Sequence, residues 1–161
     1  MPTTMRSEAL AILDSVDAHM TFEEAVAGFP DWAMNARPPN VDYTPWQLLE
    51  HLRITQWDIL EYIRNPDHVS PDWPIGYWPE RDATATGEQF AATVEAFQAD
   101  LATLRELVAD PSTDLLAVMP HTPGHTVMRE VRIVADHNAY HVGEFAILRQ
   151  VMGSWPVERR G

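Results

Sequence analysis

Apolar residues recur at helical spacing in four segments of this chain, and proline and glycine separate the segments. They cover residues 5–20, 44–64, 86–109 and 126–152. The third has the most regular stripe, at Phe90, Val94, Phe97, Leu101, Leu104 and Val108. Steps of three and four residues indicate a helix packed at a shallow angle in a bundle. We therefore expect an all-α fold, a four-helix bundle that occupies residues 1–161 as a single domain.

Capping signals predict where these helices begin and end. The expected N-caps are Thr44, Thr86 and Thr126. Gly153 is expected to stop the last helix. Thr21 and Glu24 form a capping-box pattern that predicts a short helix before Gly28. Residues 31–42 contain two adjacent prolines and are expected to form a loop.

A second loop, from residue 66 to residue 86, is long for a compact domain, and loops of that length are often functional. It carries Trp73, Tyr77 and Trp78, which we expect to hold it to the body of the protein by burial rather than to form a binding cage. Its length would allow the second and third helices to run parallel.

Charge and composition exclude several functions. The chain has 24 acidic residues and 11 basic ones, all arginine, for a net charge of −13. Phosphate backbones would repel it, so we expect no nucleic-acid partner. It has no cysteine, which excludes thiol nucleophiles and cysteine-ligated metals. No apolar run approaches the length of a membrane span, and Asp14 and Asp17 interrupt the N-terminal apolar stretch. A cytoplasmic protein with no membrane partner is expected.

Histidine carries the remaining chemistry, because the glycine-rich phosphate loops and the GxSxG nucleophile motif are absent. His137 and His141 are four residues apart in the last helix, so both imidazoles lie on one side, close enough to share a metal. His51 occupies a flank of the second helix, from which it can reach a groove between helices. A single histidine in a core is usually structural. Three from two helices predict one divalent metal ion bound by His51, His137 and His141.

Other polar residues are weaker candidates. Glu144 and Tyr140 flank the histidine pair, and Glu144 could orient a ligand or take a proton, although a solvated position fits it equally well. His121 and His125 lie in the loop before the last helix, where we expect them to be solvated; the alternative is a contact at the mouth of the bundle. His68 is expected to be an exposed loop residue.

Two of these motifs together resemble the DinB-like (YfiT-like) family of small four-helix proteins. They are the histidine in a helix that begins with Trp46 and the sequence HNAYHVGEF, residues 137–145, in the last helix. The resemblance implies a bundle of up-down-down-up order and one zinc or nickel ion on His51, His137 and His141. It also implies a homodimer. Some members of the family are transferases or isomerases that use low-molecular-weight thiols.

The sequence leaves more than one function open. The ion could activate a small thiol for transfer to a small electrophile, and the thiol would have to arrive as a cosubstrate because the chain has no cysteine. It could instead activate water in a metal-dependent hydrolase. A non-catalytic, stress-related metal-binding or interaction module, with a structural ion, is the alternative of a different class. A helical bundle without a metal is the simplest interpretation.

Overall fold

The computed structural model describes residues 4–14 and 18–156. These residues form six α-helices and one short 3₁₀ turn; a single isolated bridge between Val118 and Thr126 is their only β pairing. The helices are α1 (Met5–Asp14), α2 (Phe22–Val26), α3 (Asp31–Met34), α4 (Pro45–Arg64), α5 (Gly87–Ala109) and α6 (Val127–Met152), and the 3₁₀ turn is Ile75–Tyr77. The expectation of an all-helical protein is confirmed.

The long helices begin and end where their capping residues predict. The side chains of Thr44 and Thr86 accept hydrogen bonds from the third helical residue, and a glutamine at that position completes each capping box. Thr126 caps α6 in the same way without the reciprocal bond. Gly153 ends α6 at φ 64°, a left-handed conformation that glycine adopts without steric cost. These local signals therefore set where α4, α5 and α6 begin and where α6 ends.

The N-terminal region differs from the expectation in two places. The first helix ends at Asp14 instead of Met20; residues 18–20 are not helical, and residues 15–17 lie outside the described part of the chain. The predicted capping box at Thr21 is present and starts α2. Residues 31–34, expected to be loop, form the single-turn helix α3, which buries Ala33 and Met34. Contact with α4 stabilises this turn, which has no side-chain cap of its own.

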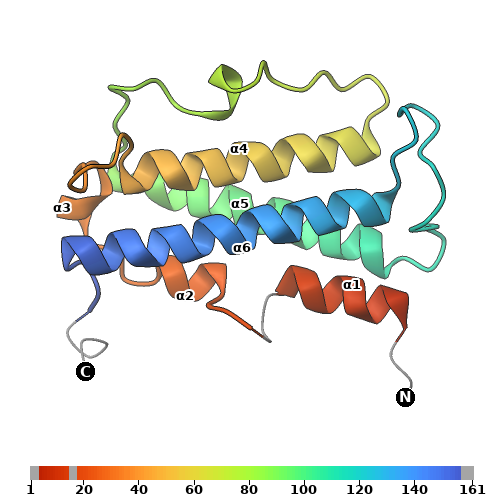
Figure 1. Ribbon diagram of the computed structural model, residues 1–161, viewed down its shortest axis with the longest axis horizontal. Coiled ribbons are helices and arrows are strands. Elements are labelled where there is room, and N and C mark those ends of the chain that lie inside the picture. Colours follow the sequence, from red (N-terminus) through yellow and green to blue (C-terminus); the bar gives the residue numbers. More distant parts are fainter. Residues whose placement is uncertain (1–3, 15–17, 157–161) are drawn as a thin grey trace.

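The three longest helices lie side by side, with α1 and α2 along one edge (Figure 1). α4 packs against both α5 and α6, and α1 also packs against both of these helices. α4 and α5 run in the same direction, opposite to α1 and α6. The predicted stripe of α5 faces this core: Phe97, Leu104 and Val108 are fully buried. None of the described helices is long and apolar enough to cross a bilayer.

The connection between α4 and α5 (residues 65–86) runs along the outer side of α4 (Figure 1). Its aromatic residues divide in their exposure. Tyr77 is buried and Trp78 is half-buried, as expected for residues that hold a loop in place, but Trp73 is 75 % exposed. The connection thus covers α4 through Tyr77 and Trp78, which contact His51 and Asp58 of that helix.

Candidate metal centre

Three histidine side chains converge between α4 and α6. His51 lies on α4, and His137 and His141 lie one turn apart on α6. One ring nitrogen from each lies within 4.8 Å of the others, and the Nε2 atoms of His51 and His137 are 3.2 Å apart. Two nitrogens bound to one tetrahedral ion at about 2.0–2.1 Å are roughly 3.4 Å apart. The His51–His137 pair therefore already has the spacing of two ligands on one ion.

The tautomer of His51 follows from its hydrogen bond to the α4–α5 connection. Its Nδ1 lies 2.8 Å from the backbone carbonyl oxygen of Tyr77. A carbonyl can only accept, so Nδ1 carries the proton and donates it. The neutral ring then presents the lone pair of Nε2 toward the other two histidines, which is the form that binds a metal.

His141 is oriented by a second chain of hydrogen bonds. Its Nδ1 lies 2.7 Å from Oε2 of Glu144, and the hydroxyl of Tyr43 donates to the other oxygen, Oε1. Because the carboxylate accepts, Nδ1 of His141 carries the proton and Nε2 keeps its lone pair. Glu144, a candidate from the sequence, thus contacts a histidine of the cluster, and Tyr43, in the segment before α4, holds it there.

His137 is the exception among the three. Its Nδ1 is buried and has no hydrogen-bond partner, while its Nε2 faces Nε2 of His51. Leaving a buried polar group unpaired costs about 1–3 kcal/mol. Hydrogen bonding through Nδ1 therefore does not explain where the His137 ring lies. The ring instead faces the centre of the cluster through Nε2.

Burial keeps the cluster neutral. Desolvation, with smaller contributions from His141 and His51, lowers the pKa of His137 to about 3. Desolvation and the proximity of His51 lower the pKa of His141 to about 4. Burial also lowers the pKa of His51, against the opposing effect of the Tyr77 carbonyl. At neutral pH all three imidazoles are therefore uncharged, each with one ring nitrogen whose lone pair can bind a cation.

Aromatic side chains surround the histidines on the outer side. The Trp78 ring stacks on the His51 ring at a centroid distance of 4.0 Å and an angle of 4°. Tyr43 lies 5.2 Å from Trp78, and Tyr140, 71 % exposed, places its ring edge-on to His141. Beside them is an open groove of about 310 Å³, lined by Asp42, Tyr43, Gln47, Trp78, Pro79 and Arg81. None of the three histidines lines this groove, which adjoins the cluster only through Tyr43 and Trp78.

The other histidines do not join this cluster. His121 and His125 lie near the C-terminal end of α4, where both contact Tyr62: Nε2 of His121 is 2.8 Å from its carbonyl oxygen, and Nδ1 of His125 is 2.9 Å from its hydroxyl. His121 is exposed, as expected, whereas His125 is half-buried. The expectation that His68 is exposed is wrong, because its side chain is only 7 % exposed and its Nε2 lies 2.7 Å from Asp58.

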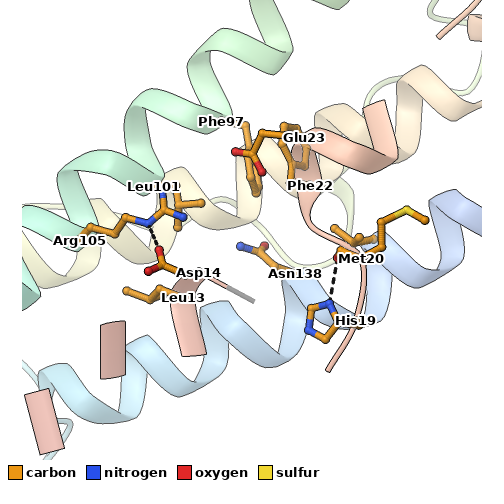
Figure 2. Close-up of a pocket in the computed structure, with 11 residues that line it drawn as sticks. Leu13, Asp14, His19, Met20, Phe22, Glu23, Phe97, Leu101, Arg105 and Asn138 are labelled. Atoms are coloured by element: carbon orange, nitrogen blue, oxygen red, sulfur yellow. Dashed lines mark hydrogen bonds and ion pairs between the residues drawn. The ribbon is translucent and has the colours of Figure 1, made fainter. Parts of the chain in front are cut away.

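A second hollow lies between α1, α2, α5 and α6 (Figure 2). Arg105 and Asp14 pair at 2.6 Å on one side of it, His19 lies on another, and Asn138 projects between them (Figure 2). Its volume is about 20 Å³. That is room for about one water molecule, not for a substrate. Within residues 4–14 and 18–156, the cluster of His51, His137 and His141 is the one group of three or more histidine or acidic residues arranged to hold a metal.

Sequence reasoning identified Glu144 but missed the two tyrosines, Tyr43 and Tyr77, that also orient the histidine cluster. Tyr43 is not among the sequence candidates, and for Tyr77 and Trp78 the sequence predicts burial that holds the loop in place rather than a binding cage. The only available signal was the density of aromatic residues in an unusually long loop. Their contacts to His51 and Glu144 join segments far apart in the chain, and spacing along one helix cannot reveal such contacts.

The family model of the DinB superfamily matches residues 16–145, which include all three histidines and Glu144. No curated protein and no protein of solved structure matches the chain.

Proposed function

The chain belongs to the DinB superfamily, and on that premise we propose that His51, His137 and His141 hold one divalent metal ion in a metal-dependent enzyme. The observation that carries the proposal is the direction of the lone pairs. The Tyr77 carbonyl and the Glu144 carboxylate hold the protons on Nδ1 of His51 and His141. Nε2 of each of these two residues therefore carries a lone pair that can bind a cation.

The donor set also bears on the identity of the ion. Neutral imidazoles suit zinc, nickel, copper and iron, and we propose zinc or nickel. Three neutral ligands leave a divalent ion its full charge and an open coordination position, through which it lowers the pKa of a bound thiol or water. Trp78 and Tyr43 shield the histidines from bulk water on the side of the groove.

We propose transfer of a small thiol to a small electrophile as the reaction. An S–H bond of the thiol is replaced by an S–C bond, the leaving group departs with its bonding electrons, and the proton passes to solvent. The chain contributes no thiol of its own, because it has no cysteine.

Two further proposals concern architecture. We propose that α1, α4, α5 and α6 form a four-helix bundle of up-down-down-up order, which their directions in Figure 1 and their mutual contacts support. We also propose a homodimer. Its support is a row of exposed side chains along α6, Tyr140, Ile147 and Val151, at spacings that place them on one face. A cytoplasmic location stays a prediction from the sequence.

Metal content of the protein purified without an affinity tag tests the proposal. We expect about one zinc or nickel ion per chain in the wild type, and loss of that ion in His137→Ala and His141→Ala. His19→Ala is the matched control, because His19 is exposed and bonds only the neighbouring backbone. Metal content that is the same in all four proteins would refute the site. A panel of small thiols and one electrophile, with no metal-dependent rate, would refute thiol transfer while leaving metal binding intact.

A further inference from the structure

The α4–α5 connection is attached to α4 at two points on one face of the helix. His51 and Asp58 are seven residues apart, so their side chains lie on the same side of α4, two turns from each other. His51 contacts the backbone carbonyl of Tyr77, and Asp58 contacts the hydroxyl of the same tyrosine. Tyr77 therefore links His51 of the cluster to the Asp58 carboxylate, two turns further along α4.

The side-chain contact is the anchor. The hydroxyl of Tyr77 donates to Oδ2 of Asp58 at 2.6 Å, and both residues are buried, at 9 % and 6 % exposure. The other oxygen of Asp58 lies 2.7 Å from Nε2 of His68, near the start of the connection. The carboxylate of Asp58 therefore fastens the connection to α4 at both His68 and Tyr77. Each of its oxygens has a partner, as a buried carboxylate requires.

The backbone contact acts on the histidine cluster. Because the ring of Tyr77 is fixed at Asp58, its carbonyl is held 2.8 Å from Nδ1 of His51. The next residue, Trp78, covers the face of the same imidazole. His51 thus receives from two consecutive residues of the connection both the acceptor that sets its tautomer and the ring that sets its plane.

We propose that Tyr77 is a positioning residue of the metal centre, and that Asp58 and His68 act through it. This inference rests on the proposed function, since it assigns a role in holding His51 as a ligand. The partners that orient a metal-binding histidine typically change metal affinity by about 10–100-fold when removed. By reciprocity of binding equilibria, a bound ion also stabilises the connection on α4.

Three variants test this role through zinc affinity, measured by competition with a chelator. Tyr77→Phe keeps the ring and the carbonyl but removes the anchor, and we expect affinity to fall about 10-fold or more. Asp58→Ala should behave alike. Asp58→Asn should retain wild-type affinity within about threefold, because its amide can accept from Tyr77 and donate to Nε2 of His68. Tyr62→Phe is the matched control, since it loses a hydroxyl contact to His125 near the other end of α4.

Two readouts separate positioning from a general loss of stability. The visible absorption of the Co²⁺-loaded protein reports ligand geometry, and we expect it to change in Tyr77→Phe and not in Tyr62→Phe. Zinc should slow amide hydrogen exchange at residues 75–78 in the wild type, and much less in Tyr77→Phe.

The outcomes distinguish this inference from the proposed function. Wild-type zinc affinity and an unchanged Co²⁺ spectrum in Tyr77→Phe would overturn the positioning role while the metal centre stands. Loss of affinity in Asp58→Asn equal to that in Asp58→Ala would also overturn it, because the hydrogen bonds would then not be what matters. A wild-type protein that binds neither Zn²⁺ nor Co²⁺ would overturn both.

Discussion

Replacement of Arg149 should destabilise the fold more than replacement of an exposed arginine in this chain. Arg149 lies on α6, two turns after His141, and is fully buried. Its guanidinium lies 4.0 Å from the ring centroid of Trp155 and 5.0 Å from that of Phe29. It donates to four backbone carbonyls at 2.6–3.3 Å, those of Ala25, Ala27, Gly28 and Ser154. The side chain therefore joins the end of α2 to the end of α6.

The size of the effect follows from these contacts. A hydrogen bond from a charged donor contributes about 1.5–3 kcal/mol. Several bonds from one side chain do not add up, and removing one partner of a buried charged network costs about 3–5 kcal/mol in total. Arg149→Met keeps much of the side-chain volume and leaves the carbonyls unpaired. We expect the free energy of unfolding to fall by about 3–5 kcal/mol. For a domain of this size that lowers Tm by roughly 6–20 °C.

Urea denaturation of the metal-free protein measures the loss directly, and Arg64→Met is the matched control. The Arg64 side chain is 48 % exposed and pairs with Glu61, an arrangement that contributes about 0.2–1 kcal/mol. If Arg149→Met costs no more than Arg64→Met, the carbonyl contacts do not stabilise the fold as argued. Folded Arg149→Met should still bind zinc, because none of these contacts involves the histidine cluster.

Three other changes have definite expected outcomes. Glu144→Ala should lower zinc affinity by about 10–100-fold in chelator competition, while Glu61→Ala leaves it unchanged; equal affinities would show that Glu144 does not support His141. Gln56→Leu removes the partner of Asn138 and of the Phe97 carbonyl, so the free energy of unfolding in urea should fall by about 1–3 kcal/mol. Burial raises the pKa of Asp100 despite nearby arginines, so its ionisation destabilises the fold. Asp100→Asn should therefore raise Tm at pH 7, with a gain that shrinks as the pH falls toward the ordinary pKa of aspartate; a gain independent of pH would contradict this.

The helical part of the fold could be predicted from the sequence because its signals are local. A threonine cap and the spacing of the apolar residues after it can be recognised in a short stretch of sequence. Thr44 and Thr86 mark the starts of α4 and α5 correctly. The same reasoning failed at residues 31–34, where prolines further along suggested a loop. Burial of Met34 and contact with α4 stabilise that turn, and neither is visible in the local sequence.

The candidate site also has a part that the sequence predicts and a part that it does not. His137 and His141 are one turn apart on a single helix, so their proximity follows from helix geometry alone. His51 could be added because a flank position on α4 can reach α6. Its 3.2 Å contact with His137 agrees with that inference. The contacts of Tyr77 with His51 and of Tyr43 with Glu144 could not be predicted, because neither tyrosine belongs to a helix whose period would place it.

The hydrogen bonds that orient the histidines have a thermodynamic consequence for the candidate metal centre. The two histidines with fixed tautomers receive their acceptors from Tyr77, which lies outside the long helices, and from Glu144, which Tyr43 holds. An isolated α6 would keep Glu144 three residues from His141, but His51 would lack the Tyr77 carbonyl and Glu144 would lack Tyr43, so the complete arrangement exists only in the folded chain. Binding to the folded state alone stabilises it by about 2.7 kcal/mol at a free metal concentration 100 times Kd. An ion on this site should therefore raise Tm by roughly 5–11 °C, and weakening either acceptor should reduce that gain more than it reduces the Tm of the metal-free protein.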